Sequence, residues 1–137
     1  MTPEAWGYLV PMLSERFLAT EACFAFSGGH SSLHYHEAKR NSFYVNFGIL
    51  SVVSFNPAGI NVETIVGGQS CHIDRFIPHY FVAMTPSQFI QFYTGEVEQD
   101  DTIEIFESGI CTDMSPDELK KMMQEEYGKF RSQIKRP

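Results

Sequence analysis

The chain has 137 residues, 43% of them hydrophobic and 14% aromatic, which is enough to build one packed domain. Its formal net charge is −7 and it has no dense Lys/Arg cluster, so the composition argues against binding to nucleic acid. No apolar run approaches the roughly 20 residues of a membrane helix. Three widely spaced cysteines form no CxxC pair and are expected to be reduced. We therefore expect one cytoplasmic domain, residues 1–137, without a membrane or nucleic-acid partner.

Short apolar runs, separated by Gly, Pro and Asn, fill most of the chain after residue 18. These runs predict β-strands, because turn residues interrupt them every few positions. The expected strands are residues 19–27, 32–36, 42–47, 49–55, 60–66, 70–74, 79–84, 89–93 and 103–106. Residues 1–18 show no clear pattern, and residues 39–41 are expected to form a polar connection or a sheet edge. Many short strands are typical of an all-β sandwich or barrel.

The C-terminal segment predicts an amphipathic α-helix over about residues 115–135. Ser115 fits the N-cap, Pro116 the first helical position and Glu118 the third residue of a capping box. Apolar residues then recur at helical spacing, namely Leu119, Met122, Met123, Tyr127, Phe130 and Ile134. A methionine stripe of this kind indicates packing against the barrel or against a partner subunit.

Two histidines, His34 and His36, lie one residue apart on an expected strand. Alternate strand residues share a face, so both imidazoles and Ser32 are expected to point the same way. Two adjacent imidazoles form half of a divalent-metal site, and His79 on a distant strand is a candidate to complete it. If Asn41 faces this site, then Phe43, Val45 and Phe47 share its side. Gln91 and Tyr93 share one face of a later strand and are expected to line a pocket wall.

The order of several short motifs resembles the cupin superfamily, and within it the C-terminal cupin domain of type II mannose-6-phosphate isomerases. The resemblance runs from about residue 5 to residue 108. It is carried by Trp6-Gly7-Tyr8, Ser31 to His36, Phe43-Tyr44-Val45 with Gly48, Gly68-Gln69-Ser70, Ile77-Pro78-His79 and Thr94-Gly95-Glu96. It implies a double-stranded β-helix, the cupin jelly-roll barrel, over about residues 19–108, followed by the C-terminal helix.

The resemblance also implies a metal site. His34, His36 and His79 match ligand positions of the family, while Asn41 falls where the family usually has a glutamate. The usual Pro-x-Gly turn before the last histidine is replaced here by Asp74-Arg75-Phe76. Nitrogen-rich ligands favour a transition metal over magnesium or calcium, and we expect zinc, iron, nickel or manganese.

Together with such a centre, the resemblance implies a small sugar or sugar-phosphate isomerase or epimerase, in which the metal polarises a carbonyl and a base moves the neighbouring proton. The candidate bases are His72, Glu37, Glu63 and His30. Lys39 and Arg40 are candidate cations for a substrate phosphate or carboxylate. His72 and Lys39 are the residues we assign to catalysis.

Two other functions fit the same residues. A non-catalytic cupin that binds a carbohydrate or another small molecule is favoured by Asn41. An Fe(II)-dependent dioxygenase is favoured by three histidine ligands. Proteins of this resemblance often pair, so we expect a homodimer that uses the first strand and the methionine-rich helix.

Overall fold

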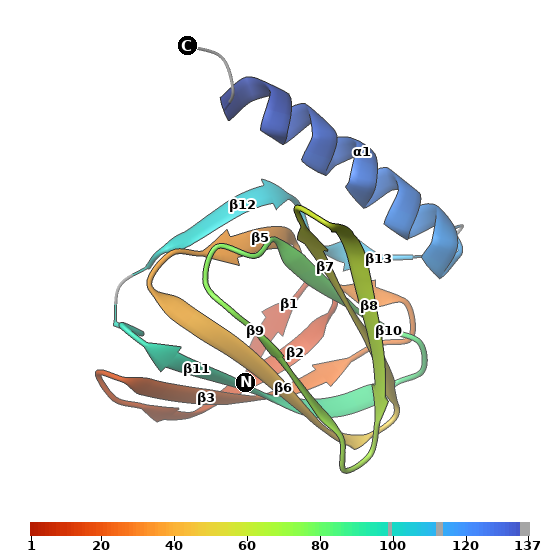
Figure 1. Ribbon diagram of the computed structural model, residues 1–137. Coiled ribbons are helices and arrows are strands. Elements are labelled where there is room, and N and C mark those ends of the chain that lie inside the picture. Colours follow the sequence, from red (N-terminus) through yellow and green to blue (C-terminus); the bar gives the residue numbers. More distant parts are fainter. Residues whose placement is uncertain (99, 112–113, 135–137) are drawn as a thin grey trace.

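The computed structural model describes residues 1–98, 100–111 and 114–134, which form an antiparallel β-barrel with one helix outside it (Figure 1). One sheet has six strands in the order β1-β2-β3-β11-β6-β9. The strands are β1 (Thr2–Glu4), β2 (Gly7–Ser14), β3 (Leu18–Ala25), β11 (Ser87–Gly95), β6 (Lys39–Phe47) and β9 (Ser70–Ile73).

The second sheet has seven strands, centred on β10. β7 pairs along one edge of β10 and β8 pairs with β7, while β5 and β4 share the other edge and carry β12 and β13. These strands are β4 (Gly29–His30), β5 (Leu33–His36), β7 (Ile49–Asn56), β8 (Gly59–Val66), β10 (His79–Ala83), β12 (Thr102–Phe106) and β13 (Gly109–Ile110).

The all-β class, the nine predicted strands and the C-terminal helix are confirmed. Four further strands were not predicted, namely β1, β2, β4 and β13, and β6 begins earlier than expected. β1 and β2 belong to the six-stranded sheet, although no strand was predicted before residue 19. Pro11 obscured β2 in the sequence, and a register shift between Pro11 and Leu13 accommodates it. Residues 39–41 are the start of β6, not a connection.

The centre of the seven-stranded sheet is covered on both faces, where β10 is buried along its whole length, whereas the edge strand β8 is largely exposed. Tyr80 and Val82 point to the helix side, where they pack with Leu119 and Met123 of α1 (Pro116–Ile134). The alternating residues, among them Phe81, point into the barrel. A strand that is buried on both faces thus divides its side chains between two separate cores.

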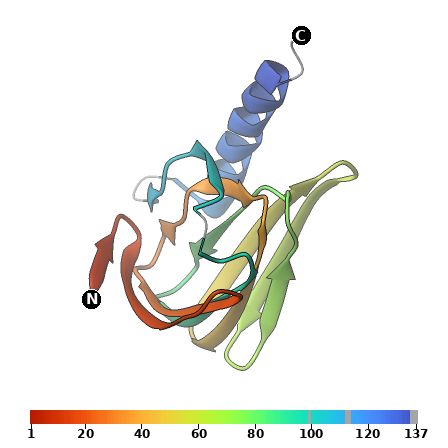
Figure 2. The same cartoon turned by 90° about the vertical axis from the view of Figure 1, so that its left-hand side faces the viewer.

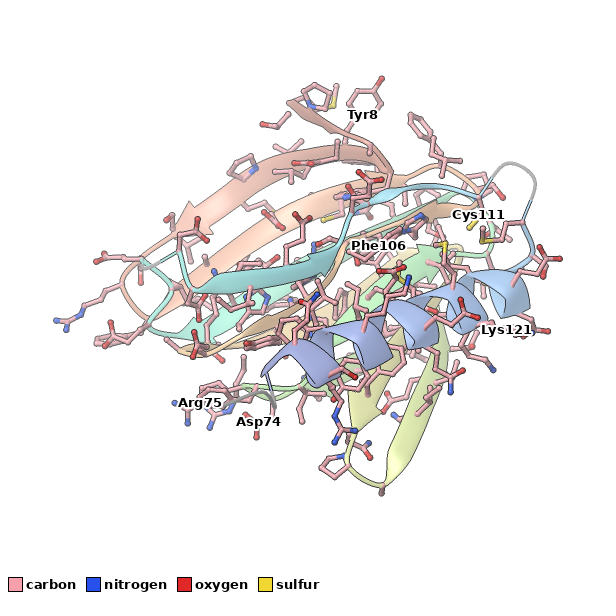
Figure 3. All side chains as sticks on the ribbon, turned by 90° about the horizontal axis from the view of Figure 1, so that it is seen from above. Tyr8, Asp74, Arg75, Phe106, Cys111 and Lys121 are labelled. Carbon is pink, nitrogen blue, oxygen red and sulfur yellow. The ribbon has the colours of Figure 1, made fainter. Side chains whose placement is uncertain are left out.

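The helix α1 closes the outer face of this sheet, on the far side of the barrel from β2 and β3 (Figures 1 and 2). The Ser115 hydroxyl accepts a hydrogen bond from the Glu118 backbone N–H at 3.2 Å, as the predicted N-cap requires. Seen from above, Phe106 and Cys111 lie beside α1 (Figure 3), and both pack into the cluster beneath it. The methionine stripe is therefore core packing, as predicted. The side chain of Ile134 and all of residue 135 lie outside the described residues.

The strand β6 has a β-bulge that corrects one sequence expectation. Asn41, Phe43 and Val45 point inward and are buried, but Phe47 is 58% exposed. On the partner strand β11, consecutive residues face Val45 and Phe47, so one extra residue of β6 lies between them. The extra residue turns Phe47 to the outer face, because side chains alternate with period two.

No helix in the described part of the chain is both long and apolar enough to span a bilayer.

Candidate metal centre

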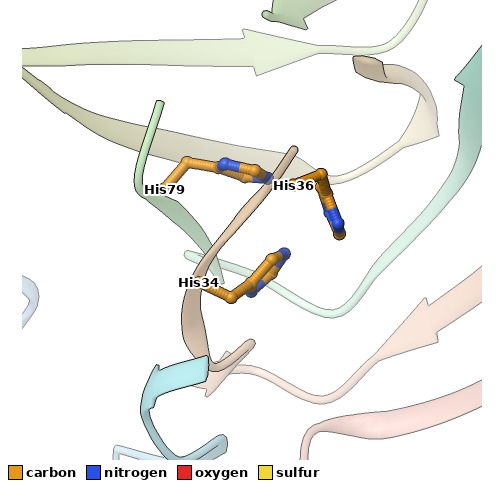
Figure 4. A group of neighbouring side chains, drawn as sticks. All are labelled: His34, His36 and His79. Atoms are coloured by element: carbon orange, nitrogen blue, oxygen red, sulfur yellow. The ribbon is translucent and has the colours of Figure 1, made fainter. Parts of the chain in front are cut away.

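Three histidines meet inside the barrel because two antiparallel strands place them in register. His79 on β10 pairs directly with His34 on β5, and His36 follows two residues later on the same face. The ring centroids are 4.6 Å apart for His34 and His79, 4.9 Å for His34 and His36, and 5.6 Å for His36 and His79. One ligand nitrogen from each ring lies within 4.8 Å of the others (Figure 4). The sequence prediction of a three-histidine cluster is confirmed.

The backbone fixes the tautomers of two of these rings. His34 Nδ1 lies 2.8 Å from the Ser32 carbonyl oxygen, and His79 Nδ1 lies 2.8 Å from the Ile77 carbonyl oxygen. A carbonyl only accepts hydrogen bonds, so each Nδ1 must carry the proton and each Nε2 must offer a lone pair. Both rings are therefore set to bind a cation through Nε2.

The third ring, His36, is supported from the side of β12. Its Nδ1 lies 3.1 Å from the Thr102 hydroxyl and 3.6 Å from the carboxylate of Asp101. Its Nε2 is buried and has no hydrogen-bond partner among the described residues. A buried polar nitrogen without a partner is costly, unless an ion or water completes it.

Asn41 extends the cluster, because its Oδ1 lies 3.2 Å from His79 Nε2. Its Nδ2 is directed to the Phe92 carbonyl, 3.4 Å away, which leaves Oδ1 as the atom that faces the histidine. Two acceptors then face each other, since His79 Nε2 carries no proton. A metal cation near both atoms would turn this repulsion into attraction. The orphaned His36 nitrogen and this acceptor pair fit a divalent transition metal held by His34, His36, His79 and Asn41.

The imidazoles are held in the neutral form that metal binding requires. Burial is the main cause that lowers the pKa of His34, and it brings the pKa of His36 to about 4 with help from neighbouring His34 and Lys39. The pKa of His79 is lowered well below its usual value, first by burial and then by His34. Neutral imidazoles bind metal without first losing a proton near pH 7.

A cavity of about 230 Å³ opens beside the histidine cluster. His34 forms part of its wall, and the predicted pocket residues Ser32, Gln91 and Tyr93 line it too. The remaining lining residues are Glu4, Trp6, Leu9, Glu21, Ser31, Phe81, Glu104 and Ser108. Phe43 and Val45, also predicted for the pocket, lie in the core cluster instead, where the Phe43 ring is 6.4 Å from that of His79.

The cavity contains a carboxylate that the sequence analysis missed, Glu21 on β3. Its Oε1 accepts hydrogen bonds from the Tyr93 hydroxyl at 3.1 Å and from Gln91 Nε2 at 3.2 Å. Burial is the main cause that raises the pKa of Glu21. The hydrogen bond from Tyr93 lowers this pKa, and the negative charge of Glu4 raises it further. Strand alternation is the sequence signal that could have identified Glu21, because this residue shares the inward face of β3 with Cys23 and Ala25.

The assignment of His72 to catalysis is corrected by its placement. Its neighbours Cys71 and Ile73 point into the core, so His72 points to the outer face of β9, where it is exposed. There its Nδ1 lies 2.7 Å from the Ser42 hydroxyl. A base on the outer face of the sheet cannot reach a substrate at the histidine cluster.

The assigned cation Lys39 does not line the cavity. Its Nζ lies 3.4 Å from Asp101 Oδ1 and 5.0 Å from the centre of the Tyr93 ring. Burial opposes ionisation of Asp101, but the Ala38 N–H and Lys39 outweigh it and lower the pKa of this carboxyl. Lys39 therefore balances the carboxylate beside His36.

The other candidates from the sequence also lie elsewhere. Glu37 and Glu63 are exposed, and Arg40 forms an exposed ion pair with Asp74 at 3.0 Å. His30 is buried on β4 and lines a different cavity, beneath α1.

Comparison with known protein families and with curated protein sequences finds no match. Solved structures do match. A mutant of oxalate decarboxylase from Bacillus subtilis superposes with a TM-score of 0.66 and 17% identity, over 74% of this chain and 29% of that chain. Oxalate decarboxylase from Lactobacillus farciminis, in a formate complex, superposes with a TM-score of 0.67 and 18% identity, over 77% of this chain and 33% of that chain.

A third structure, KdgF from Halomonas sp., gives a TM-score of 0.57 and 18% identity over 64% of this chain and 78% of that chain. This chain thus spans a third or less of the two decarboxylases but most of KdgF. At such low identity the likeness concerns the fold alone. The chain has the cupin jelly-roll fold, with a histidine cluster suited to a divalent transition metal.

The lowered histidine pKa values predict that the metal-free protein loses stability as the pH falls below about 6.5. The unfolded chain then binds protons that the folded His36, with its pKa of about 4, does not bind. The free energy of unfolding should fall by up to about 1.4 kcal/mol per pH unit for each such histidine. Glu21, with its raised pKa, works in the opposite direction. Urea unfolding at pH 7.5, 6.0 and 5.0 measures the slope.

The matched variants for this measurement are His36→Gln and His72→Gln. The first should flatten the slope, because it removes a buried group that stays neutral, and the exposed second should leave it unchanged. Equal slopes in the wild type and His36→Gln would contradict the argument.

Asn41→Asp should have opposite effects on the metal-free and the metal-loaded protein. Without metal, a buried carboxylate faces the lone pair of His79, so the melting temperature should fall. With zinc, the new charge should tighten binding at least about tenfold, equivalent to about 1.4 kcal/mol. Calorimetric titration and thermal unfolding check both effects. Asn56→Asp, at the turn between β7 and β8, keeps an oxygen that accepts the hydrogen bond of the Ala58 N–H and should change neither.

Proposed function

We propose that the protein is a metal-dependent isomerase or epimerase that moves a proton on a small, sugar-like carbonyl compound. The observation that carries the proposal is the Glu21 carboxylate, which lines the same cavity as His34 and is oriented by Tyr93 and Gln91. The fold and the histidine cluster suit many chemistries, and this carboxylate is the group that favours proton transfer.

Glu21 has the properties of a general base. A base works best with a pKa near the working pH, and burial raises the pKa of this carboxyl toward neutrality. A bound divalent metal would supply a Lewis acid that polarises the substrate carbonyl and acidifies the adjacent C–H bond. Glu21 would then accept the proton from that carbon and return it to the neighbouring carbon, while the hydroxyl proton passes to the former carbonyl oxygen, so that the enediol becomes the isomeric hydroxycarbonyl compound.

Two neighbours keep Glu21 in position for this transfer. The Tyr93 hydroxyl also lies 3.2 Å from Gln91 Oε1, but its single proton serves one acceptor at a time. Glu21 is held by the hydrogen bonds from Tyr93 and from Gln91 Nε2. Burial and then Glu21 hold the pKa of Tyr93 well above its usual value, which keeps the phenol protonated as a donor. Tyr93 and Gln91 are positioning residues, because they act through the carboxylate.

An Fe(II)-dependent dioxygenase is the second candidate. The neutral ligand set favours it, since three histidines and one amide leave the charge of Fe(II) uncompensated. Oxygen uptake by the iron-loaded protein, with no exchange of substrate protons, would favour this candidate over the isomerase. Tight binding of a ligand without turnover would instead favour a non-catalytic cupin that binds a carbohydrate or another small molecule.

The homodimer stays a prediction, but one of its expected surfaces changes. The apolar stripe of α1 packs on the chain's own sheet, where Leu119 and Met123 are fully buried. The outer face of the six-stranded sheet is the better candidate, because Tyr8 and Phe24 form a cross-strand pair there and are about 40% exposed.

Elemental analysis tests the metal centre. Protein purified without a metal-affinity tag should contain close to one transition-metal ion per chain, or take up one from zinc, iron, nickel or manganese. A His36→Ala/His79→Ala double variant should contain little, because it removes two of the three imidazoles. His72→Ala is the control and should keep the metal. A wild type that binds none of the four metals would overturn the proposal.

Proton exchange tests the role of Glu21. The metal-loaded protein should exchange the C–H protons next to the carbonyl of dihydroxyacetone with deuterium oxide, as followed by proton NMR. Glu21→Gln keeps the side-chain shape but cannot accept the proton, so exchange should slow by about 10²-fold or more. Glu63→Gln, on the exposed face of β8, should exchange at the wild-type rate. Equal rates for Glu21→Gln and wild type would exclude Glu21 as the base.

A further inference from the structure

The cavity beside the histidine cluster is negatively charged on several sides. Its charged lining residues in the described chain are Glu4 on β1, Glu21 on β3 and Glu104 on β12, and no Lys or Arg is among them. The three carboxylates come from three strands that belong to both sheets. The negative charge therefore reaches the cavity from both sheets and not from one strand alone.

Lys39 offsets this charge only in part. It lies 3.4 Å from Asp101 and 5.0 Å from the centre of the Tyr93 ring, and it lowers the pKa of Glu21 less than burial and Glu4 raise it. Arg16, in the turn before β3, is 3.8 Å from Glu96. The described lining of the cavity thus contains three carboxylates and no Lys or Arg.

The carboxylates already act on one another across the cavity. After burial, the negative charge of Glu4 is a further cause of the raised pKa of Glu21. An added anionic group in this space would meet the same repulsion, in surroundings less polar than bulk water. A hydroxyl or an ammonium group would instead find acceptors in these carboxylates and in the hydroxyls of Ser31 and Ser32.

We propose that this cavity selects substrates whose end remote from the metal is neutral or positively charged, and that it rejects phosphorylated ones. The selection rests on the proposed function, because it concerns the substrate of the same site. Of the two substrate classes suggested by the sequence, a sugar and a sugar phosphate, it retains the unphosphorylated sugar and adds an amino sugar. The metal attracts anions at its own end, so the selection acts only on the far end of the molecule.

A matched set of small ligands isolates that far end. Dihydroxyacetone, its phosphate ester and 1-amino-3-hydroxyacetone share the same hydroxyketone and differ in the charge of the other terminus. Calorimetric titration into the zinc-loaded protein measures binding without any need for turnover. We expect the neutral and the protonated amino ligand to bind at least tenfold more tightly than the phosphate ester.

Two double variants separate the local effect from net charge. Glu4→Gln/Glu104→Gln removes two charges from the cavity and leaves Glu21 in place, so the preference against the phosphate should shrink at least threefold. Glu15→Gln/Glu63→Gln removes two exposed charges elsewhere and should keep the preference. An equal change in both double variants, a phosphate ester that binds as tightly as dihydroxyacetone, or no binding of any of the three ligands would overturn the proposal.

The outcome is independent of the isomerase reaction. Selective binding without proton exchange would contradict the proposed reaction and support the charge selection. Proton exchange that is as fast with the phosphate ester as with dihydroxyacetone would support the reaction and contradict the charge selection.

Discussion

The whole arrangement depends on one strand, β10, that is buried on both faces. Because its side chains alternate, Tyr80 and Val82 must face α1 while His79 and Phe81 face the barrel interior. The helix and the metal centre are thus two consequences of the same alternation. Without α1, the outer face of this sheet would expose its apolar residues, and the strand that carries His79 would lose one of the two cores that hold it.

The histidine cluster is a group of polar side chains buried in an apolar core, and without a bound ion it lowers the stability of the folded chain. Three imidazoles are kept neutral by burial, one nitrogen of His36 has no partner among the described residues, and two acceptors face each other at His79 and Asn41. Buried groups left in this state destabilise a folded chain. A bound cation would satisfy all of them at once, which is why the donor set points to a metal and away from a purely structural hydrogen-bond network.

The solved structures that share this fold are less than 20% identical to the chain, so the activity must be argued from the residues around the centre. Two features of this chain stand out there. An amide, Asn41, lies beside the histidines, and the adjoining cavity places Glu21 among further carboxylates with no Lys or Arg in its described lining. Three imidazoles and an amide would leave the charge of a bound metal uncompensated. The negative charge in this region comes instead from the carboxylates that line the adjoining cavity.

The sequence by itself determined the all-β class, nine strands, the helix and the three histidines, because these follow from local patterns. Period-two alternation aligns His34 with His36, and helical spacing with an N-cap at Ser115 defines α1. It did not determine how strands pair. The register of β5 and β10 brings His79 to His34, and one bulge in β6 turns Phe47 outward.

Only the tertiary structure decided which polar residues share the site. Glu21 is far from the histidines in sequence and reaches the cavity because β3 pairs with β11, the strand that carries Tyr93 and Gln91. His72 points to the outer face of β9, and Lys39 forms an ion pair with Asp101. Alternation fixes the face of each residue within its own strand, but long-range pairing decides what that face meets.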